Sequence, residues 1–64
     1  MNLIEGLQKE IARNREILKF YEEIPQGVFG ATMIKRDIKI AEKAIANIDT
    51  VQMVRSLKTL RETN

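Results

Sequence analysis

The sequence contains neither cysteine nor histidine. The chain therefore cannot form a disulfide, and it lacks the thiolate and imidazole ligands on which protein zinc sites depend. It also lacks the side chains that most often act as nucleophile and base in covalent catalysis. With only 64 residues, helix packing or self-association must supply the stability that disulfides and metals give to other small domains. We expect no metal, no cofactor and no enzymatic activity.

Proline, glycine and aromatic residues are also scarce. The chain has one proline, three glycines and no tryptophan, and aromatic residues make up 5% of it against 44% hydrophobic residues in all. Strands joined by tight turns need more glycine and proline than this, whereas aliphatic side chains suit packed helices. The composition is typical of a globular all-α protein.

A strong excess of either charge is lacking as well. Eleven lysines and arginines against nine acidic residues give a net charge of +2, which is too small to indicate a nucleic acid or a membrane as the partner. No apolar run approaches the roughly 20 residues of a membrane span, and no secretion signal is recognisable. We therefore expect a cytoplasmic protein with no membrane partner.

Apolar residues at helical spacing predict the first helix. They form two lines with a seven-residue step, Ile4, Ile11 and Leu18 beside Leu7, Asn14 and Tyr21. Asn2 followed by Glu5 is typical of a helix N-cap, and Pro25 disfavours helical backbone at the residue before it. These signals predict a helix over about residues 2–23.

Two further helices are predicted after a connector. One proline and two glycines mark residues 24–30 as the connector. A second helix is expected at about 30–47 and a third at about 50–62, with one continuous helix over both as the alternative. The predicted fold is a small three-helix bundle in a single domain, a long antiparallel helical hairpin plus a shorter third helix. The residues expected inside it are Ile4, Leu7, Ile11, Leu18, Tyr21, Ile34, Ile38, Ile45, Val54 and Leu57.

The connector resembles that of a known family. Residues 24–34, IPQGVFGATMI, are similar to an IPxGxFGAxMI-type connector in a family of very short phage- and prophage-encoded helical proteins of undefined function. The similarity continues through residues 41–45 and 49–54, and it departs from the family at Ile48, where members often have glycine. The resemblance implies a setting in the cytoplasm of a bacterial host and a role in binding.

The connector is the first candidate for a binding site. Phe20, Pro25 and Phe29 fall within ten residues of one another. Aromatic side chains beside a rigid proline are typical anchors of protein interfaces. The alternative is a packing role, in which Phe29 covers the end of the first helix and Phe20 closes that cluster.

Two other positions are candidates for recognition. Asn14 lies in line with apolar residues, and a buried asparagine at a helix seam can fix the register of a dimer. Arg55, Lys58 and Arg61 step along the third helix, where helix-turn-helix proteins contact DNA. Val54 suits a packing position of that motif. A solvated basic face that complements the helix dipole is the alternative.

These features favour a small phage-derived protein-interaction module that binds a bacterial host or phage protein and forms a homo-oligomer, with a dimer favoured. Nucleic-acid binding through the basic third helix is the alternative function.

Overall fold

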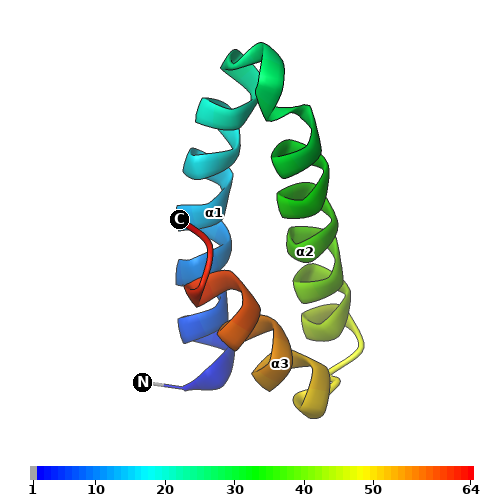
Figure 1. The fold of residues 1–64 in the computed structure, drawn as a ribbon. Coiled ribbons are helices and arrows are strands. Elements are labelled where there is room, and N and C mark those ends of the chain that lie inside the picture. Colours follow the sequence, from blue (N-terminus) through cyan, green and yellow to red (C-terminus); the bar gives the residue numbers. More distant parts are fainter. Residues whose placement is uncertain (1) are drawn as a thin grey trace.

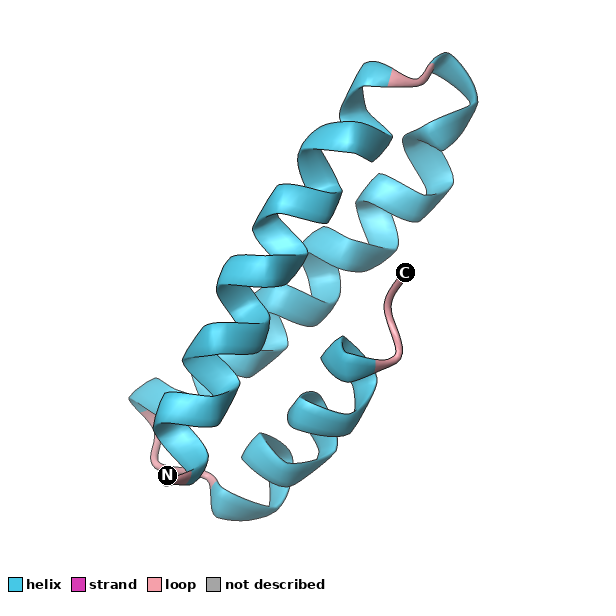
Figure 2. Ribbon diagram, turned by 90° about the vertical axis from the view of Figure 1, so that its left-hand side faces the viewer, coloured by secondary structure: helices cyan, strands magenta, loops and turns pink. Residues whose placement is uncertain are grey.

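Three helices make up the part of the chain that the structure describes, residues 2–64 (Figure 1). In this computed structural model, α1 spans Leu3–Glu23, α2 spans Val28–Ala46 and α3 spans Thr50–Arg61. The predicted all-α three-helix bundle is confirmed, because each helix packs against the other two and residues 2–64 contain no strand. α1 and α2 form the long antiparallel hairpin, and α3 covers only the half of it away from the connector (Figure 2).

The connector is shorter than predicted. Ile24 has the extended backbone that a following proline favours, at φ −102° and ψ 121°. A single 3-10 turn, η1 at Pro25–Gly27, then leads directly into α2, and the Gly27 amide donates to the Ile24 carbonyl at 2.8 Å. Residue 28 is therefore already helical, and Phe29 belongs to the first turn of α2.

A tight turn separates α2 from α3. The Ile48 amide donates to the Ile45 carbonyl at 3.1 Å and the Asp49 amide donates to the Ala44 carbonyl at 2.8 Å, the pattern of a Schellman motif. This motif needs a left-handed residue, and Ile48 takes that role with φ 51°. Glycine or asparagine normally occupies such a position, so a β-branched side chain here strains the backbone.

The core lies where the three helices meet. Eight buried side chains form it, namely Leu7, Ile11, Ile34, Ile38, Ala41, Ala44, Met53 and Leu60. Leu18, Tyr21, Ile45 and Leu57 are partly buried against this cluster. The two alanines allow α3 to approach α2 closely, because they add little side-chain volume between the backbones.

Two of the residues expected inside are exposed instead. Val54 is 55% exposed because the buried face of α3 consists of Met53, Ser56 and Leu60, and Val54 points away from that face. Ile4 is 38% exposed because it is the second residue of α1 and lies at the open end of the bundle.

Candidate functional site

Large apolar side chains are exposed around the connector. Phe20 is 69% exposed, Ile24 49%, Val28 68% and Phe29 79%. We call these four residues the connector patch. The expectation that Phe29 packs onto the end of α1 under Phe20 is therefore wrong, because neither ring is buried. Pro25 is exposed as well and begins the η1 turn between the two phenylalanines.

Tyr21 fills the space that Phe29 was expected to fill. Its ring lies so close to Gly30 that a Cβ atom on Gly30 would stand 2.5 Å from two ring carbons. Its hydroxyl donates to the carbonyl of Asn64 at 3.1 Å. Because Tyr21 closes this end of the bundle, the side chains of the connector patch are not needed to pack the core.

Charged residues lie beside Phe20, which lines a shallow hollow together with Glu16, Lys19 and Glu23. Lys19 pairs with Glu16 at 2.8 Å and Lys35 pairs with Glu22 at 3.2 Å, both on the surface. A hydrogen bond from Lys19 to Glu16, together with the charge of that carboxylate, raises the pKa of Lys19 above its ordinary value. Exposed pairs contribute little to stability, so these residues are free to act as a polar rim.

Asn14 is buried between α1 and α3 of one chain and does not lie on the outer surface of the bundle. Its side chain is 0% exposed, and its Nδ2 donates to the carbonyls of Glu10 at 2.8 Å and Leu60 at 3.1 Å. Arg13 donates to the same Leu60 carbonyl at 2.5 Å and to the Thr63 carbonyl at 3.1 Å. The register that Asn14 fixes is therefore that of α3 on α1.

The three basic residues of α3 are exposed and share its outer face. Among residues 2–64, no ion pair involves Arg55, Lys58 or Arg61. Val51 and Val54 lie on the same face, 65% and 55% exposed. The exposure of Val54 contradicts the packing position expected for it in a helix-turn-helix motif.

Two other features are absent from residues 2–64. Residues 2–64 hold no group of three or more acidic side chains that could bind a metal ion. None of the three helices combines the length and the apolar character that a bilayer crossing requires.

The sequence anticipated the aromatic part of the connector patch but missed Ile24 and Val28. Both lie within the predicted connector, residues 24–30, and their apolar character beside Pro25 and Phe29 is the only signal that could have revealed them. Comparison of the chain with protein-family models, curated proteins and solved structures finds no match.

Proposed function

We propose that this protein is a small protein-interaction module that binds a bacterial host or phage protein through the connector patch. The observation that carries the proposal is the exposure of Phe20 and Phe29 at one end of a bundle that Tyr21 already closes. Phenylalanine is rarely left this exposed, and aromatic side chains dominate the energy of protein interfaces. The resemblance of the connector to that of short phage proteins supplies the bacterial setting.

The partner surface must extend beyond the four side chains. The whole chain exposes 4643 Å², and a standard interface buries about 800 Å² on each partner. The rim around Phe20, with Glu16, Lys19 and Glu23, provides the polar margin that such an interface needs. The partner is expected to offer an apolar pocket with polar groups at its edge.

Truncation of either phenylalanine should weaken the complex without unfolding the domain. We expect Phe20→Ala or Phe29→Ala to raise the dissociation constant of a partner purified from bacterial lysate by about tenfold or more. Thermal midpoints should stay close to that of the parent protein, because both side chains are mostly exposed. Titration calorimetry with the purified partner provides the measurement.

Val51→Ala and Val54→Ala are the matched controls, because they remove exposed apolar atoms at the other end of the molecule. They should leave the affinity unchanged. Normal binding by both phenylalanine variants, or equal losses in all four variants, would contradict the proposal.

A second candidate function is nucleic-acid binding through α3. Arg55, Lys58 and Arg61 favour it, because all three cations are exposed on one face and none belongs to an ion pair among residues 2–64. Affinity for duplex DNA should then fall steeply with salt, with a logarithmic slope of roughly −0.9 for each phosphate contacted. Replacing the three cations with glutamine should remove most of that slope. Absence of binding at low salt would eliminate this function.

A further inference from the structure

The turn between α2 and α3 is strained. Ile48 is a β-branched residue held in the left-handed region at φ 51°, and its side chain is 74% exposed. Because the side chain is mostly exposed, burial of its apolar surface does not offset this strain. The strain is relieved if Ile48 becomes helical.

Nothing in the sequence of the turn prevents α2 and α3 from joining. Residues 46–50, Ala-Asn-Ile-Asp-Thr, contain neither glycine nor proline. In a helix over residues 28–61, about 50 Å long, the amides that now close the turn would instead bond to carbonyls four residues back. The amides of the turn can therefore be satisfied in two ways, by the strained turn that the structure shows and by a continuous helix without that strain.

The joined helix cannot keep α3 on its own hairpin, so the α3 binding surface would be left empty. That surface is complementary to specific groups of α3. It buries Met53 and Leu60, at 2% and 0% exposed, and its Asn14 and Arg13 both donate to the Leu60 carbonyl. An α3 helix provides both the apolar side chains and the carbonyl that this surface binds, and a second copy of the chain supplies such a helix.

We propose that two copies of this protein exchange their α3 helices, each copy placing α3 on the α1–α2 hairpin of the other. Every contact of α3 within the closed chain is reproduced between the two copies. The exchange also brings the two turns together. Ile48 and Val51, now 74% and 65% exposed, and Ile4, 38% exposed, lie at that end of the molecule and would be covered there.

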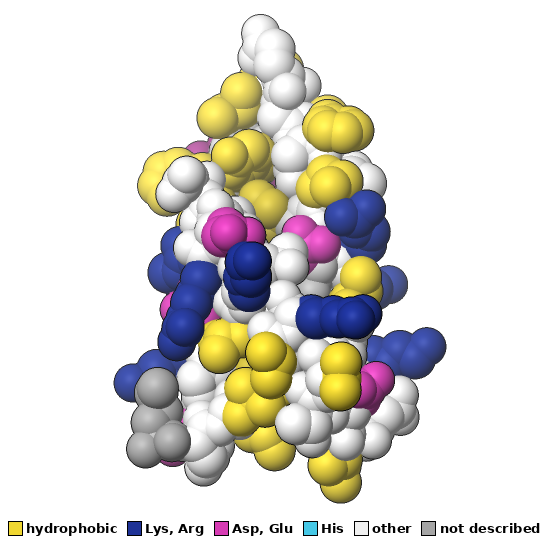
Figure 3. Space-filling view, turned by 60° about the horizontal axis from the view of Figure 1, so that its bottom comes forward, with side chains coloured by type: hydrophobic (Ala, Val, Ile, Leu, Met, Phe, Trp, Pro, Cys, Tyr) yellow, Lys and Arg dark blue, Asp and Glu magenta, His cyan; other side chains and the backbone are white. Residues whose placement is uncertain are grey.

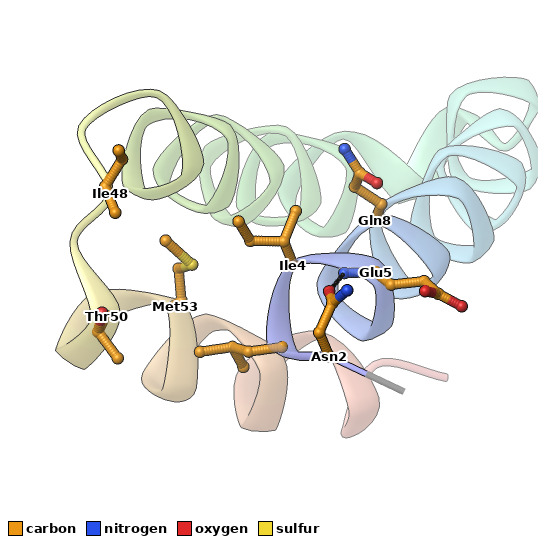
Figure 4. Close-up of a pocket in the computed structure, with 8 residues that line it drawn as sticks. Asn2, Ile4, Glu5, Gln8, Ile48, Thr50 and Met53 are labelled. Atoms are coloured by element: carbon orange, nitrogen blue, oxygen red, sulfur yellow. Dashed lines mark hydrogen bonds between the residues drawn. The ribbon is translucent and has the colours of Figure 1, made fainter.

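The surface around the turn fits this arrangement. Hydrophobic side chains gather on the end of the molecule where α2 meets α3 (Figure 3). Ile4, Ile48 and Met53 line an open depression of about 560 Å³ between the start of α1 and the turn (Figure 4). In the exchanged dimer, α1 of one copy and the turn segment and α3 of the other would line this depression together.

Refolding at millimolar concentration, followed by sedimentation equilibrium, tests the exchange. Refolding is needed because α3 must leave its binding surface before it can exchange. We expect a dimer that persists on dilution for a time set by unfolding. In a mixture of isotope-labelled and unlabelled chains, the Asn14 side-chain amide of one copy should show magnetisation transfer to Leu60 of the other.

Two substitutions at one position separate turn strain from side-chain burial. Ile48→Gly removes the strain and weakens the joined helix, so the dimer dissociation constant should rise by about a hundredfold, since two turns change. Ile48→Ala also removes most of the side chain but keeps the strain and favours the helix, so the dimer should persist or tighten.

Three results would overturn the proposal. One is a monomer at every concentration after refolding. Another is a dimer in which the contact between Asn14 and Leu60 is found only within each chain, as a surface dimer would give. The third is an equal loss of dimer in both Ile48 variants. None of these results bears on the connector patch, which lies at the other end of the hairpin.

Discussion

Asn14→Asp should unfold much of the protein near neutral pH. Asn14 is fully buried, and its Nδ2 faces two carbonyl oxygens, those of Glu10 and Leu60. An ionised carboxylate cannot donate to either carbonyl, so its charge would be buried against two carbonyl oxygens at a cost of about 3–5 kcal/mol. The nearby Arg13 guanidinium offsets this cost only in part, because it is already bonded to the Leu60 and Thr63 carbonyls. A chain of this length has a free energy of unfolding of roughly 3–10 kcal/mol. The substitution should therefore remove much or all of the stability of the fold.

The destabilisation should depend on pH in a defined direction. Burial raises the pKa of the introduced carboxyl above its value of about 3.9 in the unfolded chain. Below that unfolded value the carboxyl is neutral in both states, and its hydroxyl can donate to one of the two carbonyls. As pH rises toward the folded pKa, the charge penalty grows, and above it the penalty is complete. Urea unfolding of variant and parent at matched pH values gives the difference directly.

Asn14→Leu is the control of similar volume. The Leu60 carbonyl keeps its bond from Arg13, and the Glu10 carbonyl keeps its place in the backbone ladder of α1. The substitution also removes Asn14 Oδ1, which is buried with no hydrogen-bond partner. We expect a change of less than about 1.5 kcal/mol and no new pH dependence. A leucine variant as unstable as the aspartate variant would show that volume, and not charge, decides this position.

The helices were predictable because their signals are local. Asn2 Oδ1 accepts from the Glu5 amide at 2.8 Å, and Asp49 Oδ1 accepts from the Gln52 amide at 3.1 Å. Both caps follow from a spacing of three residues along the chain. The apolar spacing in α1 and α2 likewise identified Leu7, Ile11, Ile34 and Ile38, all of which are buried. The start of α2 was missed because a 3-10 turn and a loop share the same proline and glycine signals.

The exposure of individual residues was less predictable because it depends on contacts between helices. α3 carries Val51, Met53 and Val54 in close succession, and apolar character alone does not choose between them. Met53 is the one that is buried, because it shares a face of α3 with Ser56 and Leu60 and because Asn14 donates a hydrogen bond to the Leu60 carbonyl. The exposure of Phe29 was hidden in the same way. The sequence predicts Tyr21 inside, but it does not reveal that the Tyr21 ring lies against Gly30 at the start of α2.

Gly27→Ala should have the largest effect of any small substitution in the connector. Gly27 has φ −87° and ψ 2°, which alanine can adopt, so its backbone conformation does not require glycine. The obstacle is space, because a Cβ atom there would lie 2.3 Å from the carbonyl oxygen of Tyr21 and 3.1 Å from its carbonyl carbon. These atoms belong to the backbone at the end of α1, so the helix end itself must move. We expect a loss of about 3 kcal/mol in urea unfolding.

Gly30→Ala provides the comparison that separates a backbone clash from a side-chain clash. Its Cβ atom would meet ring carbons of Tyr21, so Tyr21→Leu should make room for it. Gly30→Ala alone should cost about 1–2 kcal/mol, because overpacking exceeds the gain in helix propensity. In the Tyr21→Leu background that cost should largely vanish, whereas the cost of Gly27→Ala should remain, since the Tyr21 carbonyl is still present. If leucine rescued both glycine positions equally, the ring and not the backbone would be what holds the connector against α1.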